Sequence, residues 1–434
     1  MLEMLLQGIS AVISDPISIV LIFLCTGIGI IFGAIPGLTA TIAIAMMLPM
    51  TFSMPTTMGI ASLVALYIGG ISGGLVSAIL LNMPGTPSSI ATCFDGRPLA
   101  LKGEGGKALG VGVVFSFIGT VLGIAAMIFI APPLASITIK FGAWEYFTVT
   151  MFSLTLIASL AGKNIVKGII TAVIGMMFAS VGLAPIDGVE RFTFGSVELT
   201  SGFAMLSVLV GLYAISEVMK TAGMMQSGEN FVATKFHMKG FGFSLQEFFS
   251  QIKNAIRSAI IGIGIGILPG IGGGTSNIVS YSIAKNQSRH PERFGTGIID
   301  GVVASETANN ATIGGAMIPL LTLGIPGDTA TAMLLGGFMI HGIQPGPLLF
   351  EAHGDIVYGV FTAMILSSFF MLIWSFGAMR LFIRILKVPK NYLFPIIVVL
   401  CSVGAYALDN RVFDAASIVL FGVIGYSLEK LKYP

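Results

Sequence analysis

Residues 16–94 read PISIVLIFLCTGIGIIFGAIPGLTATIAIAMMLPMTFSMPTTMGIASLVALYIGGISGGLVSAILLNMPGTPSSIATCF and contain no Asp, Glu, Lys or Arg. A helical membrane span needs about 20 apolar residues, so this stretch has room for about three spans. Over all 434 residues, 55% are hydrophobic and 10% are charged. A soluble domain carries roughly 25% charged residues. The composition therefore excludes a soluble enzyme and a disordered chain, and predicts a polytopic membrane protein.

The remaining apolar segments are long enough for helices. Open sheet does not survive in lipid, and the alternation of apolar and polar positions that a membrane barrel needs is absent. The fold class is therefore predicted to be all-α, with about 10–12 membrane segments. Beyond residues 17–50 and 59–94, the predicted segments lie near 108–131, 144–162, 165–183, 199–219, 258–284, 296–337, 355–379, 391–408 and 412–428.

Two motifs recur in the same order in the two halves of the chain. GIIFGAIPG at 29–37 resembles GIGIGILPG at 262–270, and ISGGLVSAILLNMPG at 71–85 resembles IGGAMIPLLTLGIPG at 313–327. Ordered matches of this kind predict an internal repeat. The interpretation is a first repeat at 1–219, a linker at 220–257 and a second repeat at 258–434, whose last span is expected to be missing.

Loop charge predicts that the two repeats are inverted. The loop 51–58 has no Lys or Arg, whereas its counterpart 285–293 has three; after the second motif, the basic residues lie at 97–107 in the first half and are absent from 338–355 in the second. Since cytoplasmic loops hold the Lys and Arg, equivalent loops lie on opposite sides of the membrane. The linker 220–257 is then cytoplasmic and the N-terminus periplasmic, and such inverted repeats are typical of secondary transporters.

The candidate site lies where Pro-Gly pairs interrupt the apolar segments, at residues 36–37, 84–85, 269–270 and 326–327. A broken helix leaves free N–H groups that suit carboxylates and free carbonyls that suit a small cation, so matched breaks indicate a transport site. The candidate substrate-binding residues are Thr39, Asn82, Pro84, Gly85, Thr86, Ser88, Ser89, Gly272, Gly273, Thr275, Ser276, Pro326, Gly327 and Thr329. The candidate cation-binding residues are Asn82, Asn277, Glu306, Asn310 and Asp328, with Na⁺ as the expected metal ion.

Two of these carboxylates have simpler interpretations. Glu306, Asn309 and Asn310 share one helical face, and a carboxylate deep in the membrane is costly and usually functional, but an interface near the membrane edge would also explain it. Asp328 takes the position of Thr86 in the repeat and could be a helix N-cap. No nucleophile, base and orienting group can be assembled, so no enzyme is predicted.

Four segments resemble a known family. GAIPGLTATIAIAMMLPMTF, LNMPGTPSSIATCFDGRPLALKGEGGKALG, GILPGIGGGTSN and TLGIPGDTATAMLLGGFMIHGIQPGP are similar to segments of the large, TctA-type membrane subunit of tripartite tricarboxylate transporters. The resemblance covers essentially the whole chain, although family members usually continue past the LKYP end with a further apolar region. It implies a permease of the bacterial inner membrane that works with a small membrane subunit and a periplasmic solute-binding protein.

The resemblance also implies uptake of citrate or other di- and tricarboxylates, driven by a Na⁺ or H⁺ gradient. No catalytic cofactor and no nucleic-acid partner are expected, and a homodimer stays open. The substrate carboxylate would bind at helix N-termini, and the motif-bearing core would move against the remaining spans by alternating access. A carboxylate channel and a non-transporting scaffold or sensor subunit are the alternatives.

Overall fold

The computed structural model describes residues 2–142, 165–184, 188–224, 241–379 and 390–433, with a few isolated positions between 144 and 151 and at 381. Most of the predicted segment 144–162, and residues 225–240 of the predicted linker, lie outside the described residues. The chain forms two compact units. Unit 1 comprises 1–47, 51–139 and 228–388, and unit 2 comprises 48–50, 140–227 and 389–434. Unit 1 therefore draws on both predicted repeats, and the repeat boundaries stay a prediction.

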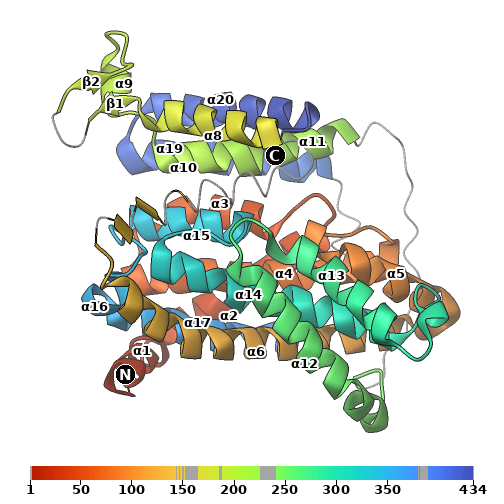
Figure 1. Cartoon of the computed structure of the whole chain (residues 1–434). Coiled ribbons are helices and arrows are strands. Elements are labelled where there is room, and N and C mark those ends of the chain that lie inside the picture. Colours follow the sequence, from red (N-terminus) through yellow and green to blue (C-terminus); the bar gives the residue numbers. More distant parts are fainter. Residues whose placement is uncertain are drawn as a thin grey trace. The chain divides into compact units, whose positions relative to one another are not determined.

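The regular secondary structure of unit 1 is helical in the residues that the structure describes (Figure 1). Its first half holds α1 Leu2–Ile13, α2 Pro16–Ala34, α3 Ala40–Thr51, α4 Thr56–Leu81, the 3-10 turn η1 Pro87–Ser89, α5 Ile90–Leu99, the π-type turn η2 Ala100–Glu104 and α6 Gly105–Thr138. Its second half holds α12 Leu245–Ile267, α13 Gly272–Gln287, the 3-10 turn η5 Pro291–Arg293, α14 Ile299–Leu323, α15 Thr329–Ile340, α16 Leu349–Ala352 and α17 Gly354–Gly377.

All four predicted helix breaks are present in unit 1. The Pro-Gly pairs separate α2 from α3, α4 from η1 and α5, α12 from α13, and α14 from α15. Proline removes a backbone donor, and the glycine after it reverses the backbone direction. Gly37 and Gly270, which occupy the same position of the first motif, both have a left-handed backbone with φ of 86° and 76°.

Two almost wholly buried helices, α4 and α14, form the centre of unit 1. Each of these two helices packs closely against a helix from earlier in the same half, because the glycines at the contact have no side chain. A Cβ on Gly33 of α2 would lie 2.0 Å from the carbonyl oxygen of Gly70 in α4, and a Cβ on Gly266 of α12 would lie 2.8 Å from that of Thr312 in α14. These small residues let the helix axes approach more closely than larger side chains permit.

The close approaches in the two halves correspond residue by residue. In the alignment of the motifs, Gly33 matches Gly266 and Gly70 matches Thr312. Three more close approaches of a glycine to a backbone carbonyl correspond in the same way. The contact of Gly29 with Leu66 matches that of Gly262 with Ala308, and the contact of Gly73 with Ile30 matches that of Gly315 with Ile263. The contact of Gly85 with Gly33 matches that of Gly327 with Gly266. This agreement supports an internal repeat, while the opposite orientation of its halves in a membrane stays a prediction.

Among the described residues, 6 helices are long and apolar enough to cross a membrane. They span Pro16–Ala34, Thr56–Leu81, Pro87–Thr138, Met205–Ala222, Gly354–Gly377 and Val412–Lys430. Shorter apolar helices include α3 and α15, which follow the breaks. The chain is therefore an all-α polytopic membrane protein, as the sequence predicted.

Unit 2 contains α8 Ile165–Ala179, a short antiparallel pair of β1 Gly182–Leu183 and β2 Glu190–Arg191, α9 Val197–Thr200, α10 Met205–Leu209, the π-type turn η3 Val210–Ile215, α11 Ser216–Met224, α19 Lys390–Asp409 and α20 Val412–Lys430. The ring of Phe421 in α20 packs edge-on against Phe178 of α8 and against Phe203. Lys220 forms ion pairs with Glu217 and Glu429.

Candidate functional site

Two broken helix ends from opposite halves meet at a site that we call junction A, formed by Thr86, Ser88, Ser89, Gly273 and Asn309. Thr86, Ser88 and Ser89 begin η1 and α5 and are buried, and the hydroxyls of Thr86 and Ser88 share a hydrogen bond of 3.0 Å. A Cβ on Gly273 would lie 2.9 Å from Ser88 Cβ and 2.7 Å from Asn309 Oδ1. The start of α13 can therefore reach these polar groups only because residue 273 is glycine.

The other two broken ends meet at junction B, formed by Thr41, Tyr67, Asp328, Thr329 and Thr331. Asp328 is the N-cap of α15: its carboxylate accepts hydrogen bonds from the Thr331 amide at 2.7 Å and from the Tyr67 hydroxyl of α4 at 2.7 Å. The Thr41 and Thr329 hydroxyls lie 3.1 Å apart. A carboxylate at a helix N-terminus is stabilised by the free N–H groups and the helix dipole. Junction B thus holds an anion that belongs to the protein.

The repeat places Thr86 opposite Asp328, Ser89 opposite Thr331, and Asn309 opposite Tyr67. The two junctions have the same hydrogen bond from a side-chain hydroxyl to a backbone carbonyl. Ser89 Oγ donates to the Thr86 carbonyl at 2.9 Å, and Thr331 Oγ1 donates to the Asp328 carbonyl at 2.9 Å. The two junctions differ in whether a carboxylate is present and in which residue stands beside it as a hydrogen-bond donor. Junction A has no carboxylate at residue 86. Asn309 is buried and its side chain interacts with the Glu306 carboxylate, but within the described part of the chain neither polar atom of its amide makes a hydrogen bond of normal geometry.

A buried amide without hydrogen bonds is costly in a folded protein. Its presence beside the start of α13 marks a place where a ligand can supply the missing partners. The two junctions also adjoin, since a Cβ on Gly272 would lie 3.1 Å from Asp328 Cβ. Together they form a single polar centre between α4 and α14.

The carboxylate of Glu306 lies on α14 and is fully buried. It accepts hydrogen bonds from the hydroxyl of Thr92 on α5, from Ser116 Oγ of α6 at 3.0 Å and from Asn310 Nδ2 at 3.4 Å. Asn310 Oδ1 in turn accepts a hydrogen bond of 2.6 Å from Ser72 of α4. Each of these partners is neutral. The Glu306 carboxylate is therefore stabilised by hydrogen bonds, but none of these partners carries a positive charge that would balance it.

The other predicted residues fall outside the two junctions or play different parts. Asn82 is exposed and ends α4 in a left-handed conformation with φ of 58°. Asn277 uses its side-chain oxygen to accept the amide of Ala91 at 2.7 Å. Ser276 bonds Thr312 at 2.7 Å, whereas Thr275 is exposed. Pro84 is exposed and Pro326 half-buried in their loops, Gly85 and Gly327 pack against helix carbonyls, and Thr39 Oγ1 accepts the Ile42 amide at 3.4 Å.

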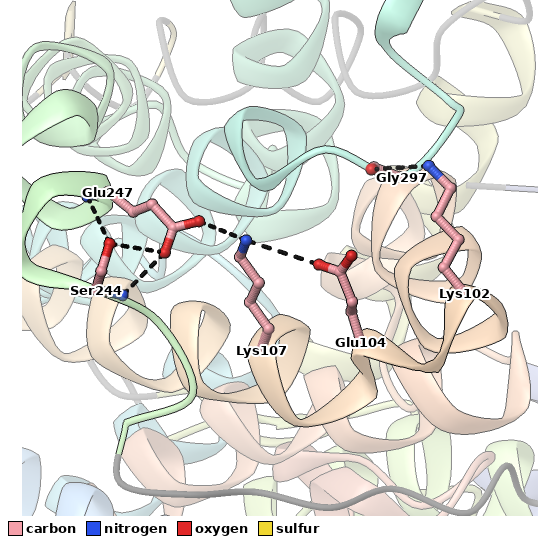
Figure 2. Close-up of polar contacts among 6 residues, drawn as sticks. All are labelled: Lys102, Glu104, Lys107, Ser244, Glu247 and Gly297. Carbon is pink, nitrogen blue, oxygen red and sulfur yellow. Dashed lines mark hydrogen bonds and ion pairs between the residues drawn. The ribbon is translucent and has the colours of Figure 1, made fainter.

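A charged cluster lies where the loop before α6, the start of α12 and the loop before α14 come together (Figure 2). The ammonium of Lys107 lies between the carboxylates of Glu104, at 3.6 Å, and Glu247. Lys102 Nζ donates to the Gly297 carbonyl at 3.5 Å. The hydrogen bond from Lys107 lowers the pKa of the Glu247 carboxyl, which lies in the predicted cytoplasmic linker. A pocket of about 370 Å³ opens between these groups.

Asp95 joins two segments at this end of unit 1, a role that was not predicted from the sequence. Its carboxylate is fully buried and accepts the backbone amides of Gly295 at 3.0 Å, Gly297 at 2.8 Å and Ile298 at 3.1 Å, together with the Tyr281 hydroxyl at 2.9 Å. Asp95 thereby ties α5 of the first half to the loop before α14 of the second. The two loops that were predicted to be cytoplasmic from their Lys and Arg are held together by it.

Sequence reasoning also missed Tyr67, Thr92 and Ser116. Their partners, Asp328 and Glu306, are more than 180 residues away in the chain. Asn309 was predicted to share a helical face with Glu306 and Asn310 but was not included among the candidate binding residues, although the repeat aligns it with Tyr67. Within the described ranges, no group of three or more His, Cys, Asp or Glu side chains is arranged to hold a metal ion. A cation at this centre would therefore depend on hydroxyl, amide and carbonyl oxygens beside single carboxylates.

Comparison with known proteins identifies similar sequences. The family model described as "Tripartite tricarboxylate transporter TctA family" matches residues 19–434. A protein from Agrobacterium vitis, described as an uncharacterized 52.8 kDa protein in the TAR-I ttuC' 3' region, is 35% identical over 416 residues, covering 96% of this chain and 82% of that protein. A second A. vitis protein, from the TAR-II ttuC' 3' region, is 38% identical over 164 residues, covering 38% of this chain and 68% of that protein. No solved structure matches the chain.

Proposed function

The chain belongs to the TctA family of tripartite tricarboxylate transporters, and we propose that it imports di- or tricarboxylates across a bacterial inner membrane by cation-coupled alternating access. Membership makes it the large membrane subunit of a transporter with a small membrane subunit and a binding protein as its partners. The family's role is transport, and no enzymatic activity is proposed. The identity of the substrate, the coupling ion and the alternating-access movement are our proposals.

The observation that carries the proposal is the difference between the two junctions. Junction B fills its helix N-terminus with the Asp328 carboxylate and the Tyr67 hydroxyl. In junction A, a threonine stands in place of the acid, and the buried Asn309 amide, which interacts with Glu306, makes no hydrogen bond of normal geometry with a described residue. A carboxylate of the substrate at junction A would accept bonds from the hydroxyls of Thr86 and Ser88, the Asn309 amide and the free N–H groups of α13.

A second feature supports cation coupling. A carboxylate buried among neutral groups must bind a proton or a cation, because an isolated buried charge costs far more than hydrogen bonds return. Glu306 has only neutral hydrogen-bonding partners, and Asp328 lies beside Gly272 at the edge of junction A. A cation near Asp328 would also reduce the repulsion between that carboxylate and the substrate. Na⁺ suits the neutral oxygen ligands, and a proton on Glu306 is the competing source of coupling.

Transport then requires movement of this centre. Both junctions and Glu306 belong to unit 1, so substrate and cation would travel with the same group of packed helices. We propose that the motif-bearing helices of unit 1 move relative to the remaining spans and expose the site alternately to the periplasm and the cytoplasm, in an elevator-like manner. Since the cation offsets the negative charges of the substrate and of the buried carboxylates on one moving body, the loaded body crosses the membrane at lower cost than the half-loaded one.

The test is uptake of radiolabelled citrate into proteoliposomes that hold this chain, its small subunit and its binding protein. Accumulation against a gradient that requires inward Na⁺ is the expected result, and accumulation with a proton gradient instead would assign the coupling to H⁺. Equilibration without accumulation would indicate a channel and would contradict the carrier. If a panel of di- and tricarboxylates gave neither uptake nor binding, the chain would be a scaffold or sensor subunit.

A further inference from the structure

Helix α12 presents an apolar stripe that no described part of the chain covers. Leu245, Phe249, Ile252, Ile256 and Ile260 recur three or four residues apart and are all exposed, Ile260 by 65%. Residues with this spacing lie on one face of a helix. The face is hollowed into a groove of about 480 Å³, lined by Ile252, Lys253, Ile256, Arg257, Ile260 and Ile261.

Two basic side chains border this groove, one helical turn apart. Lys253 is exposed and makes no hydrogen bond or ion pair with a described residue. The Arg257 guanidinium donates to the side-chain oxygens of Gln287, at 3.0 Å, and Asn254, which are neutral, and within the described residues its Nε has no partner. The Asp300 carboxylate attracts the Arg257 guanidinium electrostatically but forms no hydrogen bond with it. The groove therefore has two positive charges that no carboxylate of the described residues neutralises by contact.

The position of the groove along α12 matches the boundary between headgroups and hydrocarbon. The first turn of the helix holds Glu247, which lies in the charged cluster of Figure 2. After Arg257, the helix continues as IIGIGIGI from 260 to 267 without a charge. Lys253 and Arg257 thus lie between a polar end and an apolar end, where long basic side chains reach toward lipid phosphates.

From this arrangement we propose that α12 binds an anionic phospholipid, whose phosphate lies at Lys253 and Arg257 and whose acyl chain lies along Ile252, Ile256 and Ile260. Charge favours this occupant over a zwitterionic lipid, because a choline headgroup brings a positive charge to the two basic side chains. An apolar helix of a partner subunit would fill the groove but would leave both charges unneutralised. The site is separate from the junctions, so it does not depend on the proposed substrate.

The experiment measures lipid retained by the purified full chain in detergent, by native mass spectrometry, after titration with dioleoyl-phosphatidylglycerol or dioleoyl-phosphatidylcholine. Wild-type protein should retain phosphatidylglycerol preferentially. The double variant Lys253→Gln/Arg257→Gln should lose that preference, with retention falling about fivefold for each basic side chain removed. The matched control, Lys285→Gln/Arg289→Gln, removes an exposed basic pair of the same spacing that has no apolar groove, and should retain the lipid like wild type.

The single variant Lys253→Gln keeps the test decisive if the double variant does not fold, because Lys253 is exposed and its loss disturbs no contact. Equal retention of the two lipids by wild type, or unchanged retention in Lys253→Gln, would overturn the proposal. So would crosslinking of an Ile256→Cys variant to the small subunit in place of lipid, which would assign the groove to a protein partner.

Discussion

The two junctions have the same backbone but differ in charge. In both, a short polar residue caps a helix after a Pro-Gly break, and a hydroxyl three residues later returns a hydrogen bond to the cap carbonyl. Junction B carries Asp328 with Tyr67 as donor, and junction A carries Thr86 with Asn309 in the place of that donor. The protein has thus completed one of two equivalent helix N-termini with its own carboxylate and left the other with neutral donors.

This difference separates a structural from a binding role for otherwise equivalent positions. The Asp328 carboxylate accepts hydrogen bonds from two residues, Tyr67 and Thr331, so junction B is expected to contribute mainly to stability. Junction A has hydroxyls and an amide but no carboxylate of its own at residue 86, so it is expected to contribute mainly to ligand affinity. Variants at matched positions should therefore affect different measurements, and each prediction below tests that division.

The largest effect is expected for Gly273→Ala. The new methyl group would lie 2.7 Å from Asn309 Oδ1 and 2.9 Å from Ser88 Cβ, filling the space between these two side chains of junction A. Overpacking of this kind costs about 1–3 kcal/mol, so citrate affinity should fall roughly tenfold to a hundredfold. Gly264→Ala on α12 is the control, because a Cβ there meets nothing within 4 Å. Equal uptake by the two variants would remove junction A from the binding site.

Glu306→Gln should weaken coupling while preserving the fold. Glutamine keeps the shape and can still bond Thr92 and Ser116, but it removes the charge that a cation would neutralise. Hydrogen bonds and contacts to a charged group contribute about 1.5–3 kcal/mol, so the cation concentration for half-maximal uptake should rise roughly tenfold or more. The measurement is citrate uptake as a function of Na⁺ and, separately, of pH. An unchanged dependence on both would show that Glu306 has only a structural role.

Asp328→Ala and Thr86→Ala compare the junctions directly through thermal unfolding in detergent. Asp328→Ala removes an N-cap and leaves the Tyr67 hydroxyl unpaired, which should lower the stability of unit 1 by about 1–3 kcal/mol. Thr86→Ala breaks one hydroxyl contact with Ser88 and should cost less, while it reduces citrate affinity more. The division of roles would be contradicted if Thr86→Ala were the more destabilising of the two.

The smallest effect is expected for Lys107→Gln in the charged cluster. Lys107 and Glu247 are both partly exposed, and ion pairs of this kind contribute about 0.2–1 kcal/mol. Because Lys107 lowers the pKa of Glu247, the contribution is present at neutral pH and is lost as pH falls through that lowered value. The thermal midpoint should drop slightly at pH 7 in low salt. Wild type and variant should become indistinguishable in acid or at high salt, and a large drop under all conditions would mean that the cluster has another role.

The four breaks could be predicted because they depend on local chemistry. A Pro-Gly pair ends the helix at each of the four breaks, whereas single prolines such as Pro49 and Pro319 stay inside α3 and α14, and both repeats place the pair at the same point of each motif. Glu306 and Asp328 stood out for a similar reason, since a charge in an apolar segment is conspicuous. The N-cap interpretation of Asp328 is confirmed, although its cation-binding role stays a prediction.

The partners of these residues could not be predicted because they come from distant parts of the chain. Asp95 was not singled out from the sequence, because only the fold brings three backbone amides and Tyr281 around it. Thr275 and Ser276 looked equivalent in sequence, yet one is exposed and the other bonds Thr312. Helix rotation decides such pairs, and α13, whose polar and apolar residues are mixed around the helix, gives no signal of it.

The central claim is that a substrate carboxylate occupies at junction A the place that Asp328 occupies at junction B. The most direct measurement is equilibrium binding of radiolabelled citrate to the purified chain carrying Thr86→Asp, with Thr86→Ser as the matched control. Aspartate at position 86 should supply the missing anion from within, so binding should be lost at unchanged thermal stability, while Thr86→Ser binds nearly like wild type. Wild-type citrate affinity in a folded Thr86→Asp protein would contradict the claim.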